Sequence, residues 1–191
     1  MKYDVILAGV GGQGVLSVSA IIASSAMEEG LQVKQSEVHG MSQRGGAVYT
    51  DLRLSDEPIH SDLIPAGGAS LIISMEPLES LRYMEYFNPD GHLITSAEPE
   101  KNMDNYPDLE DVFDKINKIK NSKIIEARKL AVQAGSGRAV NMVLAGAASH
   151  YLPLKVETME NNVRKLFQRK GDKIVDVNLK AFALGREHGK Q

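Results

Sequence analysis

A run of small and β-branched residues leads directly into a glycine-rich turn at the start of the chain. The segment YDVILAGVGGQG contains Gly9, Gly11, Gly12 and Gly14, and a helical pattern follows over residues 13–28. Glycine permits positive φ and close backbone approach, and the free N–H groups at the start of a helix attract anions. A strand, a glycine turn and a helix in this order predict the first half of a βαβ unit.

Strand-like and helical patterns continue to alternate after this unit. Small and apolar residues recur at helical spacing at Leu16, Ala20, Ala23 and Met27, and Gly30 stands where the helix is expected to end. Because a helix separates the first two strands, we expect them to run parallel. Further strands are predicted at 31–38, 47–55, 69–75, 92–97 and 122–127, helices at 76–87, 109–119 and 127–135, and a turn at 88–91.

The last third of the chain has helical patterns alone, at 139–152, 155–169 and 173–189. A chain of 191 residues has the size of a single domain and is large enough to bury a proper core. We therefore expect one domain over residues 1–191. Its predicted fold class is α/β: a Rossmann-like, open, mainly parallel sheet with helices on both faces and a helical C-terminal part.

The composition excludes several function classes. With a net charge of −3 and a pI near 6.0, neither nucleic acid nor an anionic membrane is an expected partner. No apolar run reaches the roughly 18 residues that span a bilayer, and Asp4 interrupts any signal-peptide pattern, so we expect a cytoplasmic protein. The absence of cysteine excludes disulfides, a cysteine nucleophile and thiolate-held zinc or iron–sulfur groups in this chain. The scattered histidines predict no metal site.

The glycine loop is the first candidate binding site. Its GxGxxG spacing predicts an anion or nucleotide contact, although the same glycines also suit a tight turn for helix–sheet packing. Glu37 lies about 20 residues further on, where a dinucleotide-binding protein places its ribose-binding acid. A solvated glutamate at a strand end is the alternative. The predicted binding residues here are Gly9, Gly11, Gly12, Gln13 and Gly14.

A second candidate site is the segment EVHGMSQRGGAV. An arginine on a glycine loop is suited to hold a phosphate or carboxylate, and here Gly45 and Gly46 follow Arg44. His39 is a candidate for chemistry near neutral pH, although a lone histidine is more often a structural hydrogen-bonding group. His39 and Arg44 are thus the candidate catalytic residues, and the sequence does not assign a catalytic role to either. Gln43, Arg44, Gly45 and Gly46 join the predicted binding residues.

A later segment, GSGRAVNMVLAGAASHYLP, is rich in small residues. Ala139, Ala145, Gly146 and Ala148 would let this helix approach another backbone closely, either inside the domain or at a subunit interface. Asn141 stands near the start of the helix, where it could cap the helix or face a ligand, and we expect the cap.

These segments together resemble one family, the small subunits of indolepyruvate:ferredoxin oxidoreductases, which are gamma-type domains of the 2-oxoacid:ferredoxin oxidoreductases. The resemblance runs in order from about residue 2 to 185, and a set of motifs in this order is far more specific than the glycine loop alone. The motifs that carry it are GVGGQGVL, SEVHGMSQRGGAVYTDLR, LIPAGGASLIISMEPLESLRY, AVNMVLAGAASHYLPL and NLKAFALG.

The resemblance implies a subunit that is inactive alone. Enzymes of this family oxidatively decarboxylate aryl pyruvates, transfer the acyl group to coenzyme A and reduce ferredoxin. The resemblance places thiamine diphosphate and the iron–sulfur clusters on a large partner subunit. Ferredoxin would interact with the complex of the two subunits. It also implies that the two glycine loops meet at the C-terminal edge of the sheet. There Arg44 would hold part of coenzyme A or face the partner's active site, with His39 and Gln43 as polar contacts.

Two other classes stay open from the sequence. An independent NAD- or flavin-dependent oxidoreductase is supported by the GxGxxG spacing with Glu37. A regulatory module would bind an adenine nucleotide without a large partner. The sequence leaves open the preferred aryl pyruvate, the stoichiometry of the complex and whether the isolated chain forms a homodimer.

Overall fold

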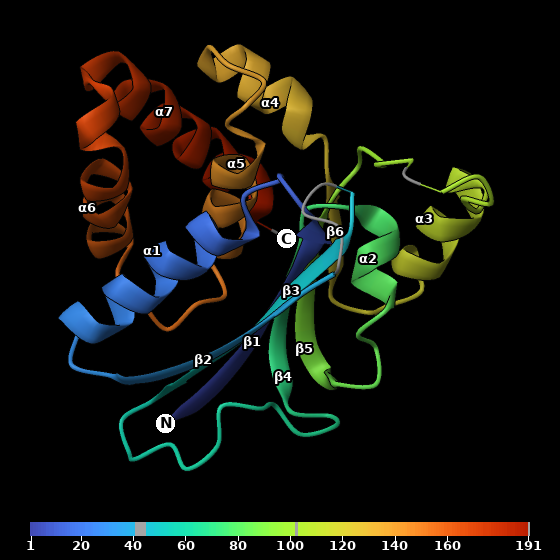
Figure 1. The fold of residues 1–191 in the computed structure, drawn as a ribbon, viewed down its shortest axis with the longest axis horizontal. Helices are drawn as coiled ribbons and strands as arrows, with labels where there is room; N and C mark the ends of the chain where they lie inside the picture. Colours follow the sequence, from blue (N-terminus) through green and yellow to red (C-terminus); the bar gives the residue numbers. More distant parts are fainter. Residues whose placement is uncertain (41–44, 102, 191) are drawn as a thin grey trace.

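The described chain folds around one six-stranded sheet (Figure 1). The computed structural model describes residues 1–40, 45–101 and 103–190. The strands lie in the order β2-β3-β1-β4-β5-β6. Their bounds are β1 (Lys2–Val10), β2 (Gln32–His39), β3 (Ala47–Ser55), β4 (Ala69–Ser74), β5 (Phe87–Ser96) and β6 (Ser122–Ile125).

Among the described strands, β3 alone runs against the direction of the other five. It pairs antiparallel with both β1 and β2, whereas β4 and β5 continue from β1 in parallel. The prediction that the first two strands share a direction is confirmed. They are not neighbours, however, because β3 lies between them. The predicted mainly parallel sheet is therefore correct, with an antiparallel insertion on one side.

Helices cover both faces of this sheet, as predicted (Figure 1). One face is covered by α2 (Pro77–Leu81) and α3 (Leu109–Asn117). The helical C-terminal part packs on the other face together with the first helix, which buries the larger of the two cores. The helices of that face are α1 (Val15–Glu28), α4 (Ala127–Ala134), α5 (Val140–Ala148), α6 (Val156–Phe167) and α7 (Asp172–Gly189), and a short 3₁₀ turn, η1 (Gln168–Lys170), joins the last two. Among the described residues, no helix is long and apolar enough to cross a membrane.

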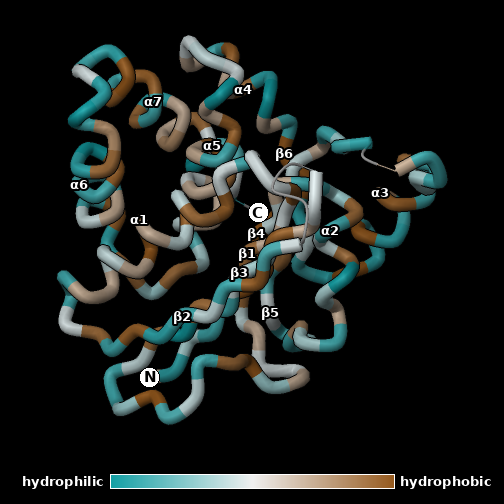
Figure 2. The backbone as a smooth tube through the Cα atoms, viewed as in Figure 1, coloured by the Kyte–Doolittle hydropathy of each residue, from teal (hydrophilic) through white to brown (hydrophobic). Residues whose placement is uncertain are grey.

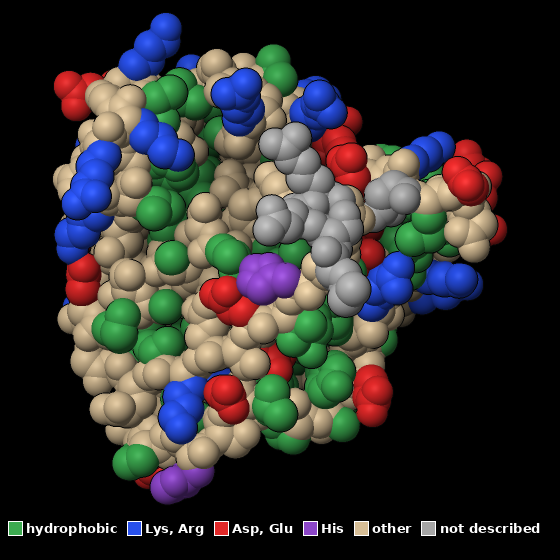
Figure 3. Space-filling model, in the orientation of Figure 1, with side chains coloured by type: hydrophobic (Ala, Val, Ile, Leu, Met, Phe, Trp, Pro, Cys, Tyr) green, Lys and Arg blue, Asp and Glu red, His purple; other side chains and the backbone are tan. Residues whose placement is uncertain are grey.

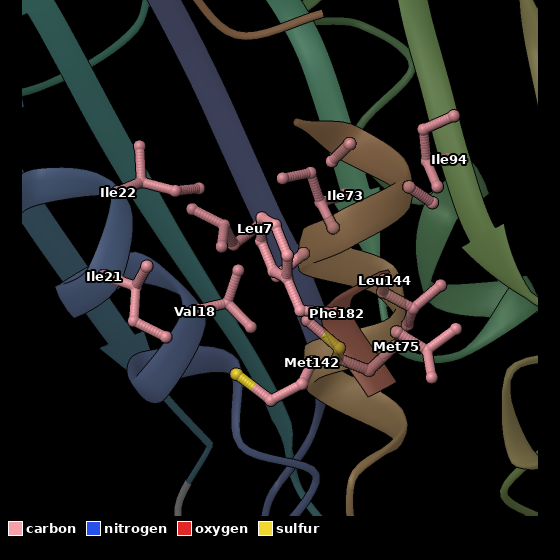
Figure 4. Close-up of a cluster of buried hydrophobic side chains, with 14 of the residues drawn as sticks. Leu7, Val18, Ile21, Ile22, Ile73, Met75, Ile94, Met142, Leu144 and Phe182 are labelled. Atoms are coloured by element: carbon pink, nitrogen blue, oxygen red, sulfur yellow. The ribbon is translucent and has the colours of Figure 1, made fainter. Parts of the chain in front are cut away.

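The larger core forms where α1, α5 and α7 meet the central strands (Figure 4). Leu7 of β1, Ile73 of β4, Ile22 of α1 and Met142 of α5 belong to one cluster, and the ring of Phe182 from α7 lies beside Leu7. All five side chains are fully buried. Figure 2 shows the same division along the tube, with hydrophobic strands and α5 inside and mainly hydrophilic residues along α6. Burial of aliphatic side chains at about 25 cal/mol per Å² makes this core a main source of stability.

The side of α1 that packs on the sheet differs from the spacing noted in the sequence. The buried side carries Val18, Ile21 and Ile22. Leu16 and Met27, two of the residues that recur at helical spacing, are 38% and 58% exposed. Two apolar stripes therefore run along the same helix, and only one of them is covered within this chain.

Residues 76–91 differ from their predicted structure. The predicted helix at 76–87 is only one turn long, and the predicted turn at 88–91 lies within β5. The turn chemistry is still present, because Asn88 Oδ1 accepts the Asp90 N–H at 2.9 Å. Gly91 is approached by backbone carbonyls from β4, where the pairing shifts register. A bulge in a continuing strand thus replaces the turn.

Small residues bring α5 and α7 into direct backbone contact. A Cβ atom added at Gly146 would lie 1.9 Å from the carbonyl oxygen of Phe182, and one at Gly185 would lie 1.9 Å from that of Val143. Real Cβ atoms do not approach oxygen so closely, so only glycine fits at either position. The small residues of α5 serve packing inside this chain, which is the first of the two interpretations of their pattern.

We predict that Gly185→Ala lowers the free energy of unfolding by at least about 2 kcal/mol, because α5 and α7 must separate to admit the methyl group. Urea unfolding measures this effect. Gly137→Ala is the matched control, since its Cβ would meet only Val132 at 3.5 Å, and it should change stability by less than about 0.5 kcal/mol. Equal effects of the two substitutions would contradict the close contact.

Candidate functional site

The glycine loop forms a tight turn between β1 and α1. Gly12 has φ of 101° and Gly14, the residue that caps α1, has φ of 83°. Gln13 closes the turn, because its Oε1 accepts the Val10 N–H at 2.8 Å. The sharp turn directs the N-terminus of α1 toward the edge of the sheet where β1 ends. A helix N-terminus carries a partial positive charge, which is suited to bind an anion.

The two predicted loops meet at this edge. The Gly11 N–H donates to the Gly46 carbonyl at 2.8 Å, and Val10 pairs with Ala47 at the end of the β1–β3 ladder. The antiparallel direction of β3 brings its first residues beside the last residues of β1. The expected proximity of the loops is thus confirmed for their described residues. Gln43 and Arg44 lie outside the described residues, so their predicted contacts stay predictions.

His39 lies at the end of the edge strand β2 and is half exposed. Its Nε2 is 3.2 Å from Glu37 Oε2, and the Gln35 side-chain amide donates to the other carboxylate oxygen. Gln35 in turn accepts from the Ser19 hydroxyl of α1 at 2.7 Å. His39 also lines an open cavity of about 530 Å³ together with Gly11 and other residues of the glycine loop. The structure therefore places the His39 ring beside the predicted binding loop.

The position of Glu37 disfavours a dinucleotide site. Neighbouring strands lie about 4.8 Å apart, so the insertion of β3 moves β2 to about 10 Å from β1. In a dinucleotide-binding sheet the ribose-binding acid follows the strand beside the glycine loop. Both carboxylate oxygens of Glu37 also have protein partners already. The GxGxxG spacing is present, but the acid that would complete a ribose site is one strand too far away.

A second cavity opens beside the glycine loop, where β1 and β4 end. The helix after β1 covers one face of the sheet and the helix after β4 covers the other, so this is the point at which an open α/β sheet places ligands. The cavity has a volume of about 460 Å³. Its lining residues are Gly12, Gln13, Met75, Ser96, Glu98, Pro99, Glu100, Arg128, Gly137, Arg138 and Val140.

Glu98 lines this cavity, and buried Glu76 lies behind its wall, where it accepts the Glu100 N–H at 3.3 Å. Glu98 Oε1 accepts the Arg128 backbone N–H at 3.0 Å in the first turn of α4, and its Oε2 accepts from the Ser96 hydroxyl. Buried Glu76 caps α2 through the Glu79 N–H at 2.8 Å and also accepts from the Tyr106 hydroxyl. Burial and the Glu76 carboxylate raise the pKa of Tyr106, which stays a neutral donor. The acids thus hold three segments together at the cavity wall.

Two arginines are the cations of this cavity. The side chains of Arg128 and Arg138 are exposed, and within the described part of the chain neither guanidinium has a hydrogen-bond or carboxylate partner. Arg53 shows the contrast, because it is buried and makes two hydrogen bonds to Asp4, at 3.0 and 3.2 Å. An unpaired guanidinium beside a helix N-terminus is suited to bind phosphate or carboxylate.

Arg128 and Arg138 were not among the predicted site residues. The signal that would have found them is positional, because Arg128 follows the end of β6 and Arg138 precedes α5. Both lie beyond the carboxyl ends of the strands, where the topology of the sheet places ligands. No local motif marks either residue.

Asn141 corrects another prediction. The cap residue of α5 is Ala139, and no side chain caps that helix. Instead, the Asn141 amide lies against the glycine loop, with Nδ2 at 3.4 Å from the Gly14 carbonyl oxygen, and its Oδ1 accepts the Met142 N–H at 3.0 Å. Asn141 therefore joins the helical C-terminal part to the loop.

Comparison with known proteins assigns this architecture to a family. The family described as pyruvate ferredoxin/flavodoxin oxidoreductase matches residues 4–188. The chain belongs to this family.

Curated members of the pyruvate ferredoxin/flavodoxin oxidoreductase family match nearly the whole chain. The indolepyruvate oxidoreductase subunit IorB of Archaeoglobus fulgidus is 37% identical, over 97% of this chain and 94% of the relative. The subunit of the same name from Pyrococcus horikoshii is 36% identical, over 100% of this chain and 97% of the relative. The family resemblance noted in the sequence is therefore confirmed.

Solved structures share the fold. A 2-oxoglutarate:ferredoxin oxidoreductase from Magnetococcus marinus, with 2-oxoglutarate, coenzyme A and succinyl-CoA bound, aligns with a TM-score of 0.78 at 21% identity. The match covers 98% of this chain but only 31% of that longer chain. The pyruvate oxidoreductase subunit PORC of Thermotoga maritima aligns with a TM-score of 0.71 at 22% identity, over 98% of this chain and 96% of that one.

We predict that Gly14→Ala destabilises this family member more than Gly12→Ala does. Both positions have positive φ, which costs about 1–2 kcal/mol for a residue with a Cβ atom. A Cβ at Gly14 would also lie 2.4 Å from Asn141 Nδ2, whereas one at Gly12 meets nothing within 4 Å. Urea unfolding of both variants measures the difference.

Removing the Asn141 side chain tests the cause of that difference. In an Asn141→Ala background, Gly14→Ala should lower the free energy of unfolding about as much as Gly12→Ala does. Only the cost of placing a Cβ atom at positive φ is then left at either position. An unchanged difference would show that Asn141 does not contact the loop.

Proposed function

We propose that this chain is the small subunit of an indolepyruvate:ferredoxin oxidoreductase. The complete enzyme would oxidatively decarboxylate indolepyruvate and other aryl pyruvates to aryl-acetyl-CoA and reduce ferredoxin, and residues 1–191 would form its single gamma-type domain. The observation that carries the proposal is the difference in similarity between branches of the family. Four relatives named indolepyruvate oxidoreductase subunit IorB are 34–37% identical over nearly the full chain. Three relatives named 2-oxoglutarate synthase subunit KorC are only 25–27% identical.

Thiamine diphosphate and the iron–sulfur clusters would lie on a large partner subunit. This chain has no cysteine, so it cannot supply thiolates to such a cluster. Neither the glycine loop nor the cavity beside it presents redox chemistry of its own. The activity therefore requires assembly, and this chain contributes binding and positioning.

The cavity beside the glycine loop is the proposed contact for a phosphate group of coenzyme A. Its support is the combination of Gly12 and Gln13, which lie just before α1, with the side chains of Arg128 and Arg138. The opposing carboxylate of Glu98 is already occupied by Arg128 N–H and Ser96. Holding the phosphates here would orient the coenzyme A thiol toward the partner's active site and lower the entropic cost of acyl transfer.

The predicted residues at the mouth of the loops complete this proposal. Arg44, with Gln43, would add a second anion contact from the RGG loop, and His39 would be a polar contact of the same ligand or of the partner subunit. Gly9, Gly11, Gly12 and Gly14 would allow the ligand to approach the backbone closely. With these residues, the proposed site extends from the cavity lined by Arg128 and Arg138 to the side chain of His39.

Assembly is the first test. The chain is expressed with and without the large subunit, and indolepyruvate- and coenzyme A-dependent reduction of ferredoxin or a viologen dye is assayed. We expect activity in the mixture and none in either subunit alone. Tight binding of NAD or flavin by the isolated chain, without any association with the large subunit, would instead support the independent dinucleotide-binding oxidoreductase.

We predict that Arg128→Ala and Arg138→Ala each raise the KM for coenzyme A about 5- to 10-fold, the usual effect of losing one charged hydrogen bond to phosphate. The KM for indolepyruvate should not change. Lys129→Ala is the matched control, because Lys129 neighbours Arg128 but already pairs with Glu126 at 2.8 Å. An unchanged KM for coenzyme A in both arginine variants would contradict this site.

A further inference from the structure

The surface helix α1 has the composition of a buried helix. Residues 15–27 contain no charged side chain, although this stretch is nearly the whole helix. A helix that packs on one side normally carries charged residues on its other side, and α6 follows this rule with four charged residues among twelve. An uncharged circumference is typical of a helix that is covered on all sides, as α5 is within this chain.

The uncovered side of α1 carries no charged residue before Glu28 and is mostly apolar, with Ser17 and Ser24 half-buried beside the apolar residues. Leu16, Ala20 and Met27 are exposed along it, and Leu166 of α6 lies across a groove of about 550 Å³ that Ala20 and Met27 also line. We call these four residues the α1 outer face. In Figure 3, hydrophobic and uncharged surface covers the region of α1, whereas Lys and Arg side chains gather at the outer edge over α6. The Glu28–Lys165 ion pair joins the two helices at the groove.

The α1 outer face is continuous with the candidate site. Leu16 also lines the open cavity that Gly11, Gly12 and His39 form at the end of β1. An occupant of the α1 outer face therefore reaches the glycine loop without a break in the contact surface.

Other exposed apolar side chains of the described chain do not form such a surface. They lie on separate parts of the chain: Met1 before β1, Val38 on β2, Leu63 between β3 and β4, Val132 on α4 and Ile174 on α7. Single exposed apolar residues are ordinary on protein surfaces, whereas a stripe of them on an uncharged helix indicates an interaction site.

We infer that the α1 outer face is the docking surface for the large subunit, which would present an uncharged apolar patch to it. This inference rests on the proposed function and names the surface by which that assembly forms. A partner bound there would lie beside the glycine loop. The ligand held at the proposed site must reach the partner's active centre from that position. A second copy of this chain on the same face would close the glycine-loop mouth to the partner.

Related enzymes in longer chains support the same occupant. The match to this chain spans 31% of the 2-oxoglutarate:ferredoxin oxidoreductase chain and 36% of a ketoisovalerate oxidoreductase subunit VorA. In those chains the equivalent region is joined covalently to a much larger remainder. A separate small subunit must replace that covalent link with a surface contact, and the α1 outer face is the apolar surface available for it.

Charge substitution on the α1 outer face tests the inference. Met27→Glu and Met27→Lys place either charge at a side chain that is 58% exposed in the free chain, so both variants should fold normally. Each should weaken binding to the purified large subunit about 100-fold, because a charge buried against an apolar partner loses its hydration. Val132→Glu is the matched control, since it adds a charge at an exposed apolar residue of another helix and should bind like the unmodified chain.

Every outcome separates the alternatives. Unchanged affinity for the large subunit in both Met27 variants would overturn an apolar docking surface. Weaker binding in only one of the two variants, Met27→Glu or Met27→Lys, would also overturn it. An unmodified chain that is a dimer by light scattering, and a monomer as Met27→Glu, would assign the face to a second copy and also overturn the inference. Failure of the unmodified chain to bind the large subunit would instead contradict the proposed function itself.

Discussion

The position of β1 in the centre of the sheet determines where the candidate site lies. β1 pairs with β3 over its whole length and with β4 on its other side, and residues 4–10 are all buried. A strand so constrained fixes the point at which the chain leaves the sheet. Because α1 then turns to one face and α2 to the other, the space between their starts is open to a ligand. The glycine loop only shapes a crevice that the topology has already created.

The helical C-terminal part supports that crevice from a distance in the sequence. Gly146 and Gly185 let α5 and α7 touch along their backbones, which brings α5 down onto the strands. Asn141, at the start of α5, then contacts the carbonyl of Gly14 from 127 positions further along the chain. The backbone contact between two helices and the conformation of the loop are thus parts of one packed unit. The last third of the chain therefore supports the glycine loop and also supplies Arg128 and Arg138 to the cavity, although none of its motifs indicates a ligand.

Local patterns predicted the elements well because each depends on neighbouring residues. The glycine turn, the helix end at Gly30 and the third strand, 47–55, were all found where the sequence indicates them. The insertion of β3 between β1 and β2 was not predictable in this way, because strand order depends on contacts between distant segments. That one difference moves Glu37 away from the glycine loop and removes the main support for a dinucleotide site. Arg128 was missed for the same reason, since only the assembled sheet edge makes it a neighbour of Gly12.

The stripe of Leu16, Ala20 and Met27 shows what helical spacing leaves undecided. The spacing of apolar residues predicts a helix, but it does not identify which side of that helix packs on the sheet. α1 buries Val18, Ile21 and Ile22 against the sheet and keeps the stripe on its outside. A helix with two apolar sides is suited to two partners, and this chain contains one of them. The second stripe begins beside the glycine loop, so a partner that covered it would adjoin the crevice that β1 creates. The proposed docking surface and the candidate site therefore share one short stretch of chain, the last residues of β1 and the first turn of α1.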